Sequence, residues 1–231
     1  MYALFVTGTD TGVGKTYIAS RLANHWYSMG IKVGVFKPAE TGCADDRPTD
    51  AMTLLAAANS GQTLAEVCPY RLREPLAPAV AAEREGVTID FPKIYSELKS
   101  LNKTFEILLV EGAGGILVPF TEHMTYLDLV VAADLPVLIV AGNRLGCINH
   151  ALLAERACLT AGARPLGIIL NNFLGTQTPD ALSNQEVIER MARSPMFGAW
   201  PHNPIASPGR LENREREIAA AVLSALRMME P

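Results

Sequence analysis

Short apolar runs recur along the chain, and they are continuous rather than alternating. They cover residues 3–6, 33–36, 107–110, 137–140 and 166–170. A strand that is covered on both faces has this pattern, and such strands belong to parallel sheets. The runs therefore predict the buried strands of a mostly parallel β-sheet.

Stretches with helical spacing of apolar residues lie between and after these runs. They cover residues 15–29, 50–58, 92–101, 148–161, 184–191 and 212–229. Gly30 and Gly162 follow two of them, where a helix commonly ends on a residue with positive φ. Alternation of strands and helices predicts an α/β fold in which helices flank the sheet. Residues 199–208 contain three prolines and predict an irregular loop. No linker is evident, so we expect a single domain over residues 1–231.

Composition narrows the class of protein. Apolar residues make up 49% of the 231 residues, which is ample for a core, and the formal net charge is −4. Mild acidity argues against a nucleic-acid or anionic-membrane surface, because both need a basic patch. The apolar runs are too short to cross a bilayer, and the first ten residues carry no basic leader. Four scattered cysteines without a C-x-x-C pair predict a reducing, cytoplasmic location.

The strongest chemical signal is the segment from Gly8 to Thr16, GTDTGVGKT, which follows a predicted strand and opens a predicted helix. Glycines let backbone N–H groups converge on an anion at the helix N-terminus. Lys15 would neutralise the β and γ phosphates, and Thr16 would offer a hydroxyl to Mg²⁺. The first glycine stands one residue earlier than in G-x-x-x-x-G-K-[ST]. A glycine-rich turn before an ordinary helix is the alternative, but the intact Gly-Lys-Thr favours nucleotide binding.

A second signal is Glu111, which follows the apolar run 107–110 and precedes the glycine-rich residues 112–115. An acid at the carboxyl end of a buried strand lies in the crevice where α/β sheets bind ligands. Glu111 would hold Mg²⁺ directly or through water, and the glycines would let the backbone approach phosphate. A surface glutamate is the alternative, which the nearby phosphate loop disfavours. The run lacks the third glycine of a dinucleotide fingerprint.

Other polar residues that follow strands or begin a helix each allow two interpretations, one functional and one structural. Lys37, after the second strand, would bridge two anions or be a solvated loop lysine, and spacing does not decide between them. Asp50 would be a second metal carboxylate or part of a helix cap. Asn171 and Asn172 would contact an adenine edge or form a turn. The sequence has no hydrolase, zinc-protease or cysteine–histidine pattern.

Together these segments resemble the dethiobiotin synthetases, ATP-dependent cyclo-ligases of biotin synthesis. The resemblance runs along nearly the whole chain, and LGCINHA is its most diagnostic part. It is carried by FVTGTDTGVGKT (5–16), KPAETG (37–42), the helix at Asp50, LVEGAGG (109–115), LGCINHA (145–151) and GIILNN (167–172). The fold it implies is that of the P-loop NTPases, a mostly parallel sheet flanked by helices.

The resemblance also implies site residues. Lys37 and Lys15 would be catalytic, and Thr16, Asp50 and Glu111 would hold Mg²⁺. ATP would be bound by Gly12, Val13, Gly14, Lys15, Thr16, Tyr17, Asp50, Glu111, Gly112, Ala113, Gly114, Asn171, Asn172, Pro201, His202 and Asn203. The substrate would contact Thr11, Lys37, Thr41, Leu145, Gly146, Cys147, Ile148 and Asn149. The family is a homodimer, and residues 145–149 would reach the substrate bound by the other subunit.

The implied reaction joins 7,8-diaminononanoate and CO₂ at the expense of ATP, through a carbamate and a carbamic–phosphoric anhydride. Two other functions compete with it. A cobyrinate-type synthetase coupled to an amidase would need a glutamine-hydrolysing domain, for which 231 residues leave no room. A partitioning ATPase switch usually carries a lysine early in the phosphate loop, where this chain has Asp10.

Overall fold

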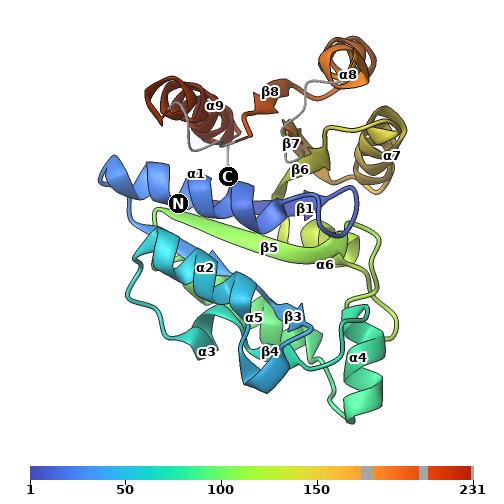
Figure 1. Ribbon diagram of the computed structural model, residues 1–231. Coiled ribbons are helices and arrows are strands. Elements are labelled where there is room, and N and C mark those ends of the chain that lie inside the picture. Colours follow the sequence, from blue (N-terminus) through green and yellow to red (C-terminus); the bar gives the residue numbers. More distant parts are fainter. Residues whose placement is uncertain (173–178, 203–207, 230–231) are drawn as a thin grey trace.

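The computed structural model describes residues 1–172, 179–202 and 208–229 (Figure 1). Within this part of the chain, six strands form a parallel sheet in the order β2-β5-β1-β6-β7-β8. The five predicted runs lie in five of these strands, which confirms the predicted parallel sheet. The strands are β1 (Tyr2–Gly8), β2 (Val33–Phe36), β5 (Ile107–Gly115), β6 (Pro136–Gly142), β7 (Arg164–Asn171) and β8 (Met196–Trp200).

Helices cover both faces of the sheet, and each face has its own hydrophobic core. One core includes residues of α1 (Lys15–Ser28), α2 (Thr49–Ala58), α3 (Leu64–Val67) and α9 (Pro208–Met228). The other includes residues of α4 (Pro78–Glu85), α5 (Phe91–Asn102), α6 (Tyr126–Ala133), α7 (Cys147–Thr160) and α8 (Pro179–Met191).

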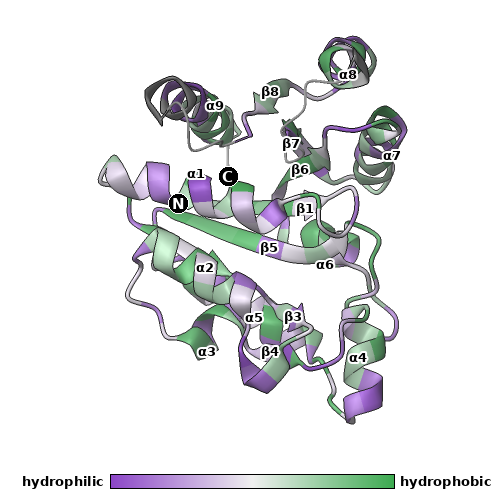
Figure 2. Cartoon of the chain, viewed as in Figure 1, coloured by the Kyte–Doolittle hydropathy of each residue, from purple (hydrophilic) through white to green (hydrophobic). Residues whose placement is uncertain are grey.

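Strand β1 shows why the apolar runs are continuous. Leu4 and Val6 belong to the core under α1, whereas Ala3 and Phe5 belong to the core on the opposite face. Successive side chains of a strand point to opposite faces, so a strand between two cores has no polar face. Figure 2 shows β5 as a hydrophobic strand in the same sheet.

The predicted helix ends are confirmed at Gly30 and Gly162, which have φ values of 82° and 80°. Two predicted helices are longer than expected at their N-termini, because α8 begins at Pro179 and α9 at Pro208. Proline fits the first turn of a helix, where its missing N–H has no intrahelical partner. Within the described residues, no helix combines the length and apolar character needed to cross a bilayer.

The prediction of an irregular loop over residues 199–208 is wrong at both ends. Ala199 and Trp200 belong to β8, which pairs with β7, and Pro208 opens α9. Residues 203–207 lie outside the described residues. The short helices α3, α4 and α6, and a small sheet of β3 (Ala39–Thr41) and β4 (Tyr70–Leu72), were also not predicted. These elements span only three to eight residues, too few for a periodic pattern to stand out.

The sheet register brings the predicted functional segments to one edge. Phe36 of β2 pairs with Val110 of β5, so the next residues, Lys37 and Glu111, stand side by side. Val6 of β1 pairs with Glu111 on its other side, just before the glycine-rich loop. An open α/β sheet usually binds its ligand at the carboxyl ends of its strands. The site lies where the loops of two neighbouring strands lead to helices on opposite faces of the sheet.

Candidate nucleotide and metal site

The loop between β1 and α1 is held by an amide from β7. Asn171 Nδ2 donates a hydrogen bond to the carbonyl of Val13 at 3.0 Å. Gly14 caps α1 with φ of 91°, and a Cβ there would lie 2.1 Å from Asn171 Nδ2. Only glycine fits this position, because both the left-handed backbone and the neighbouring amide exclude a side chain. The first N–H groups of α1 have no intrahelical acceptor and are available to an anion.

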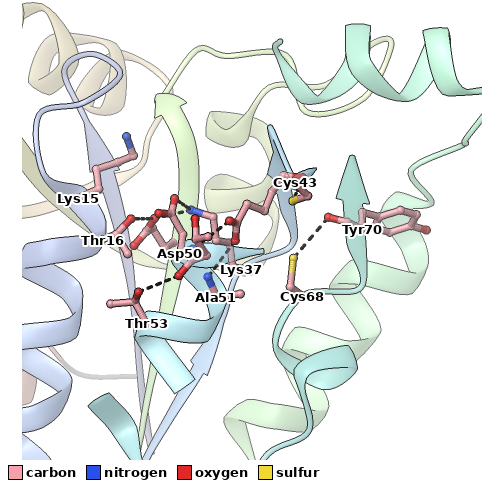
Figure 3. A network of polar contacts seen from close by, with 12 residues as sticks. Lys15, Thr16, Lys37, Cys43, Asp50, Ala51, Thr53, Cys68 and Tyr70 are labelled. Atoms are coloured by element: carbon pink, nitrogen blue, oxygen red, sulfur yellow. Dashed lines mark hydrogen bonds and ion pairs between the residues drawn. The ribbon is translucent and has the colours of Figure 1, made fainter. Parts of the chain in front are cut away.

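Lys15 opens α1 and is largely buried, with 8% of its surface exposed. Its ammonium donates to the carbonyl of Asp10 at 3.4 Å. Burial lowers the pKa of Lys15, although the charge of Glu111 acts in the opposite direction. Figure 3 shows Lys15 beside the polar network rather than within it. A bound phosphate would hold this lysine in its charged form.

Lys37 lies at the centre of the polar network and is 2% exposed, so the alternative of a solvated loop lysine is wrong (Figure 3). Its ammonium is 2.5 Å from Glu111 Oε1 and 2.8 Å from Asp50 Oδ2. Burial opposes the charge on Lys37, but the two carboxylates outweigh it and raise its pKa. Burial would likewise raise the pKa of Asp50, but the Lys37 charge outweighs it and lowers that pKa.

Three oxygen-bearing side chains meet next to this lysine. Thr16 Oγ1 donates to Glu111 Oε1 at 2.8 Å, and Asp50 shares Lys37 with the same glutamate. Glu111 Oε2 is buried and has no hydrogen-bond partner among the described residues. Hydroxyl and carboxylate oxygens are ligands that Mg²⁺ prefers, and Mg²⁺ usually adds substrate phosphates and waters to one or two carboxylates. The orphaned oxygen and this donor set fit the predicted metal.

Glu40 of β3 is a site residue that sequence reasoning missed. Its two carboxylate oxygens accept hydrogen bonds from the backbone N–H groups of Asp50 and Ala51, each at 2.9 Å. Glu40 therefore caps α2, and the alternative reading of Asp50 as a helix cap is wrong because its side chain pairs with Lys37. The one sign of Glu40 in the sequence is that it is an acidic residue within the segment KPAETG (37–42).

A cavity of about 740 Å³ opens above these groups. Ten predicted site residues line it: Thr11, Gly12, Gly14, Lys15, Thr16, Lys37, Thr41, Asp50, Ala113 and Gly114. It is completed by residues that were not predicted: Glu40, Pro75, Leu76, Ala77, Pro78 and Val118. The cavity thus combines cationic and anionic groups on one side with an apolar wall on the other.

The predicted adenine residues lie at the ends of β7 and β8. The backbone N–H of Asn172 donates to the carbonyl of Trp200 at 3.1 Å, which brings Asn172 beside Pro201 and His202. Asn172 Oδ1 accepts from Asn143 Nδ2 at 2.7 Å. Asn203 lies outside the described residues.

Three further predicted ATP-binding residues do not line the cavity. Val13 is a buried residue of the phosphate loop itself. Tyr17, in the first turn of α1, directs its hydroxyl to Glu215 of α9 at 3.5 Å. Gly112, in β5, packs its backbone against Phe5, since a Cβ at Gly112 would lie 2.8 Å from that ring.

The predicted substrate residues 145–149 follow β6 and begin α7. All five are described, and none of them lines the cavity of its own chain. Leu145 is 84% exposed, and Leu117 and Leu153 are also exposed. Leu117 and Leu153 border a second hollow of about 200 Å³ together with Gly8 and Thr9. Exposed apolar side chains around a hollow are typical of a surface that contacts another molecule.

Comparison with known proteins places the chain in a family. The family model described as an AAA domain, a P-loop NTPase family, matches residues 2–210. The ATP-dependent dethiobiotin synthetase BioD of Anaeromyxobacter sp. (strain Fw109-5) is 43% identical over 197 residues, covering 85% of this chain and 88% of that protein. The protein of the same name from Bacillus licheniformis is 40% identical, covering 92% of this chain and 91% of its own length.

Solved structures agree on the fold. The cell-division ATPase MinD of Pyrococcus furiosus matches with a TM-score of 0.58 at 17% identity, over 96% of this chain and 98% of that chain. MinD of Pyrococcus horikoshii, complexed with Mg-ADP, matches with a TM-score of 0.56, over 99% of this chain and 96% of its own. At such low identity these likenesses confirm the P-loop NTPase fold alone. The sequence relatives carry the narrower assignment: the chain belongs to the AAA-domain P-loop family and, within it, to the ATP-dependent dethiobiotin synthetases.

Proposed function

We propose that this chain is the cyclo-ligase that forms dethiobiotin from 7,8-diaminononanoate, CO₂ and ATP, with Mg²⁺ as its cofactor and residues 1–231 as one ligase domain. The observation that carries the proposal is the position of Lys37. Its buried ammonium lies between Glu111 and Asp50 and lines the same cavity as the phosphate loop. A second anionic reactant bound there would be next to the triphosphate.

The triphosphate is proposed to bind the loop from Gly12 to Tyr17 and the glycine-rich residues 112–114. Lys15 and the free N–H groups at the start of α1 supply positive charge to it. The adenine is proposed to lie at the ends of β7 and β8, near Asn172, Pro201 and His202. Asn171 Nδ2 already donates one N–H to Val13, so its second amide N–H and its amide oxygen would be left for adenine.

The chemistry needs no covalent intermediate with the enzyme. One amine of the substrate bonds to CO₂ and loses a proton, which gives a carbamate. A carbamate oxygen bonds to the γ-phosphorus, and the bond from that phosphorus to ADP breaks. The second amine then bonds to the carbonyl carbon and loses its proton, and phosphate leaves with the C–O bonding pair. Ring closure is fast because both amines belong to one molecule.

Positive charge is the chain's main contribution to this reaction. The carbamate and ATP are both anions, so Lys15 and Lys37 reduce their repulsion and stabilise charge as the phosphoryl group moves. Lys37 is fitted to this role because two carboxylates hold it charged in a buried position. Thr16, Asp50 and Glu111 would hold Mg²⁺, which supplies charge neutralisation of the phosphates.

The active unit is proposed to be a homodimer in which residues 145–149 reach the substrate of the partner subunit. The exposure of Leu145, Leu117 and Leu153 supports this arrangement. So does the position of residues 145–149 outside their own chain's cavity. The apolar wall from Pro75 to Pro78 would contact the alkyl chain of the substrate. The cytoplasmic location stays a prediction.

The test of the function is product identification. The purified protein is incubated with Mg-ATP, bicarbonate and 7,8-diaminononanoate, and the products are analysed by mass spectrometry. We expect a cyclic urea, with ADP release that requires the diamine. ATP turnover that ignores the diamine but rises with a protein or membrane would instead support the ATPase switch.

A further inference from the structure

The proposed reaction leaves one buried carboxylate of the cavity without a chemical task. Glu40 is 5% exposed, and both of its oxygens are committed to backbone N–H groups. Because these bonds use both oxygens, Glu40 is poorly placed to bind a reactant. Its contacts are instead with the peptide units of Asp50 and Ala51.

Helix α2 lacks a cap of its own. Its N-cap residue is Pro48, which offers no side-chain acceptor, and no side-chain hydrogen bond closes its first turn from within. The first N–H groups of a helix need an acceptor, and a negative charge there is favourable. Glu40 supplies both from β3, a separate element.

The capped residue is also the one that faces the lysine. The backbone of Asp50 is held by Glu40, and its carboxylate is held by Lys37 at 2.8 Å. Glu40 and Lys37 are three residues apart, so one short segment holds Asp50 at two points, its backbone N–H and its carboxylate. These contacts restrain the start of α2 and the Asp50 carboxylate, while Ala51, Leu54 and Ala58 pack the rest of the helix into the core.

We propose that Glu40 is a positioning residue for Asp50, which holds the start of α2 so that the Asp50 carboxylate faces Lys37 and the Mg²⁺ position. The inference rests on the proposed role of Asp50 in the metal site. Groups behind a metal ligand commonly change metal affinity by about 10- to 100-fold when they are removed.

Glu40→Gln is the sharpest variant, because it keeps the shape and turns one acceptor into a donor that faces an N–H group. Glu40→Asp is the second variant, since it keeps the charge but is too short to reach both N–H groups. Glu155→Gln is the matched control. Glu155 of α7 is fully buried and lies on the opposite face of the sheet from α2. It accepts from two consecutive N–H groups, those of Arg193 and Ser194, but through Oε1 alone.

The measured quantity is the affinity for ATP with Mg²⁺ and with EDTA. The ratio of the two affinities reports how strongly the metal is coupled to the nucleotide, and no diamine is present. We expect Glu40→Gln to lower this ratio about tenfold or more. Glu40→Asp should lower it less, and ATP affinity in EDTA should change less than about twofold. Glu155→Gln should leave the ratio unchanged. Amide hydrogen exchange should quicken at residues 50–51 in Glu40→Gln, whereas Glu155→Gln keeps a carbonyl acceptor for the N–H groups of Arg193 and Ser194.

A double-mutant cycle decides whether Glu40 acts through Asp50. In an Asp50→Asn background, Glu40→Gln should not lower the ratio further. An unchanged ratio in Glu40→Gln and Glu40→Asp, or an equal loss with and without Asp50, would overturn the inference. The binding assay is independent of dethiobiotin formation, so failure of the proposed reaction would be seen separately.

Discussion

The ammonium of Lys37 lies 2.5 Å from Glu111 Oε1, and both side chains are almost completely buried. This contact follows directly from the pairing of β2 with β5, because the two residues come one step after the Phe36–Val110 pair. A buried charge of either sign is unfavourable when it is unpaired. The charged form of each residue is therefore stable in this position only because the other residue is present. The pair therefore places a lysine, held in its charged form, where the phosphate loop meets the cavity.

Lys37→Ala should lose most of its turnover and keep nucleotide binding. The variant lacks the cation beside the transferred phosphoryl group, and we expect kcat/KM to fall by about 10²–10³-fold. Affinity for ATP, measured by calorimetry, should change little because Lys15 and the loop remain. Lys32→Ala, at an exposed lysine, is the control and should keep full activity. Near-complete activity of Lys37→Ala would show that the lysine assignment is wrong.

The same variant should be less stable. Removal of one partner of a buried ion pair leaves an uncompensated charge and destabilises a protein by about 3–5 kcal/mol. The exposure of Asp50 places this variant toward the lower end of that range. Urea unfolding at neutral pH measures the change, and Lys37→Ala/Glu111→Gln should recover part of it. A double variant as unstable as Lys37→Ala would argue against a direct charge coupling.

Substitutions of Asn171 and Gly14 should have non-additive effects on ATP affinity. Asn171→Ala removes the donor to Val13 and should lower stability by about 1–2 kcal/mol and weaken ATP binding. Gly14→Ala should be worse, because its Cβ would meet Asn171 Nδ2 and the φ of 91° would be strained. In an Asn171→Ala background the collision is absent, so Gly14→Ala should lower ATP affinity by a smaller factor. Fully additive losses would exclude contact between these positions.

Stability should fall in weak acid because of His25 in α1. Burial is the main cause that lowers the pKa of His25 below 6.5, Arg21 and Arg216 act in the same direction, and Glu215 opposes them. Between the two pKa values, His25 of the unfolded chain binds more protons than His25 of the folded chain. The stability that neutral His25 contributes is therefore fully present above pH 6.5 and is lost as the pH falls through the folded pKa. His25→Gln should have a flatter profile of urea midpoint against pH between about 5 and 7. An unchanged slope, at constant m-value, would refute this origin.

Mixed dimers should test whether the active site is shared. Lys37→Ala and Asn149→Ala are each expected to be nearly inactive as homodimers. Random exchange of subunits gives half heterodimers, each with one intact site, so mixing should restore up to about a quarter of wild-type activity. Leu145→Asp should shift the protein to monomers in sedimentation. No recovery on mixing, with dimers still present, would show that each chain forms its site alone.

Much of the site was predictable because it follows strands with strong patterns. The runs before Lys37 and Glu111 predicted two strands, and adjacency of their ends in a parallel sheet brought both residues to one edge. The order of strands was not predictable, because continuous apolar runs do not specify their neighbours. Whether Lys37 is solvated also depends on α2, which brings Asp50 over it.

Glu40 and β8 illustrate what sequence patterns do not reveal. The task of Glu40 depends on the distant start of α2, where Pro48 leaves N–H groups without an acceptor. Strand β8 contains Gly198 with φ of 118° and is followed by prolines, so its pattern was typical of a loop. Its strand character comes from pairing with β7 and from the burial of Trp200.

The most direct test of the account follows one oxygen atom. The protein is mixed with Mg-ATP, the diamine and ¹⁸O-labelled bicarbonate in a single turnover, faster than the label exchanges with water, and the released phosphate is analysed by mass spectrometry. A carbamate oxygen that attacks the γ-phosphorus beside Lys37 predicts phosphate with one ¹⁸O atom, in step with formation of the cyclic urea. Phosphate without label, formed at the same rate, would mean that water attacks ATP and would contradict the proposed anhydride.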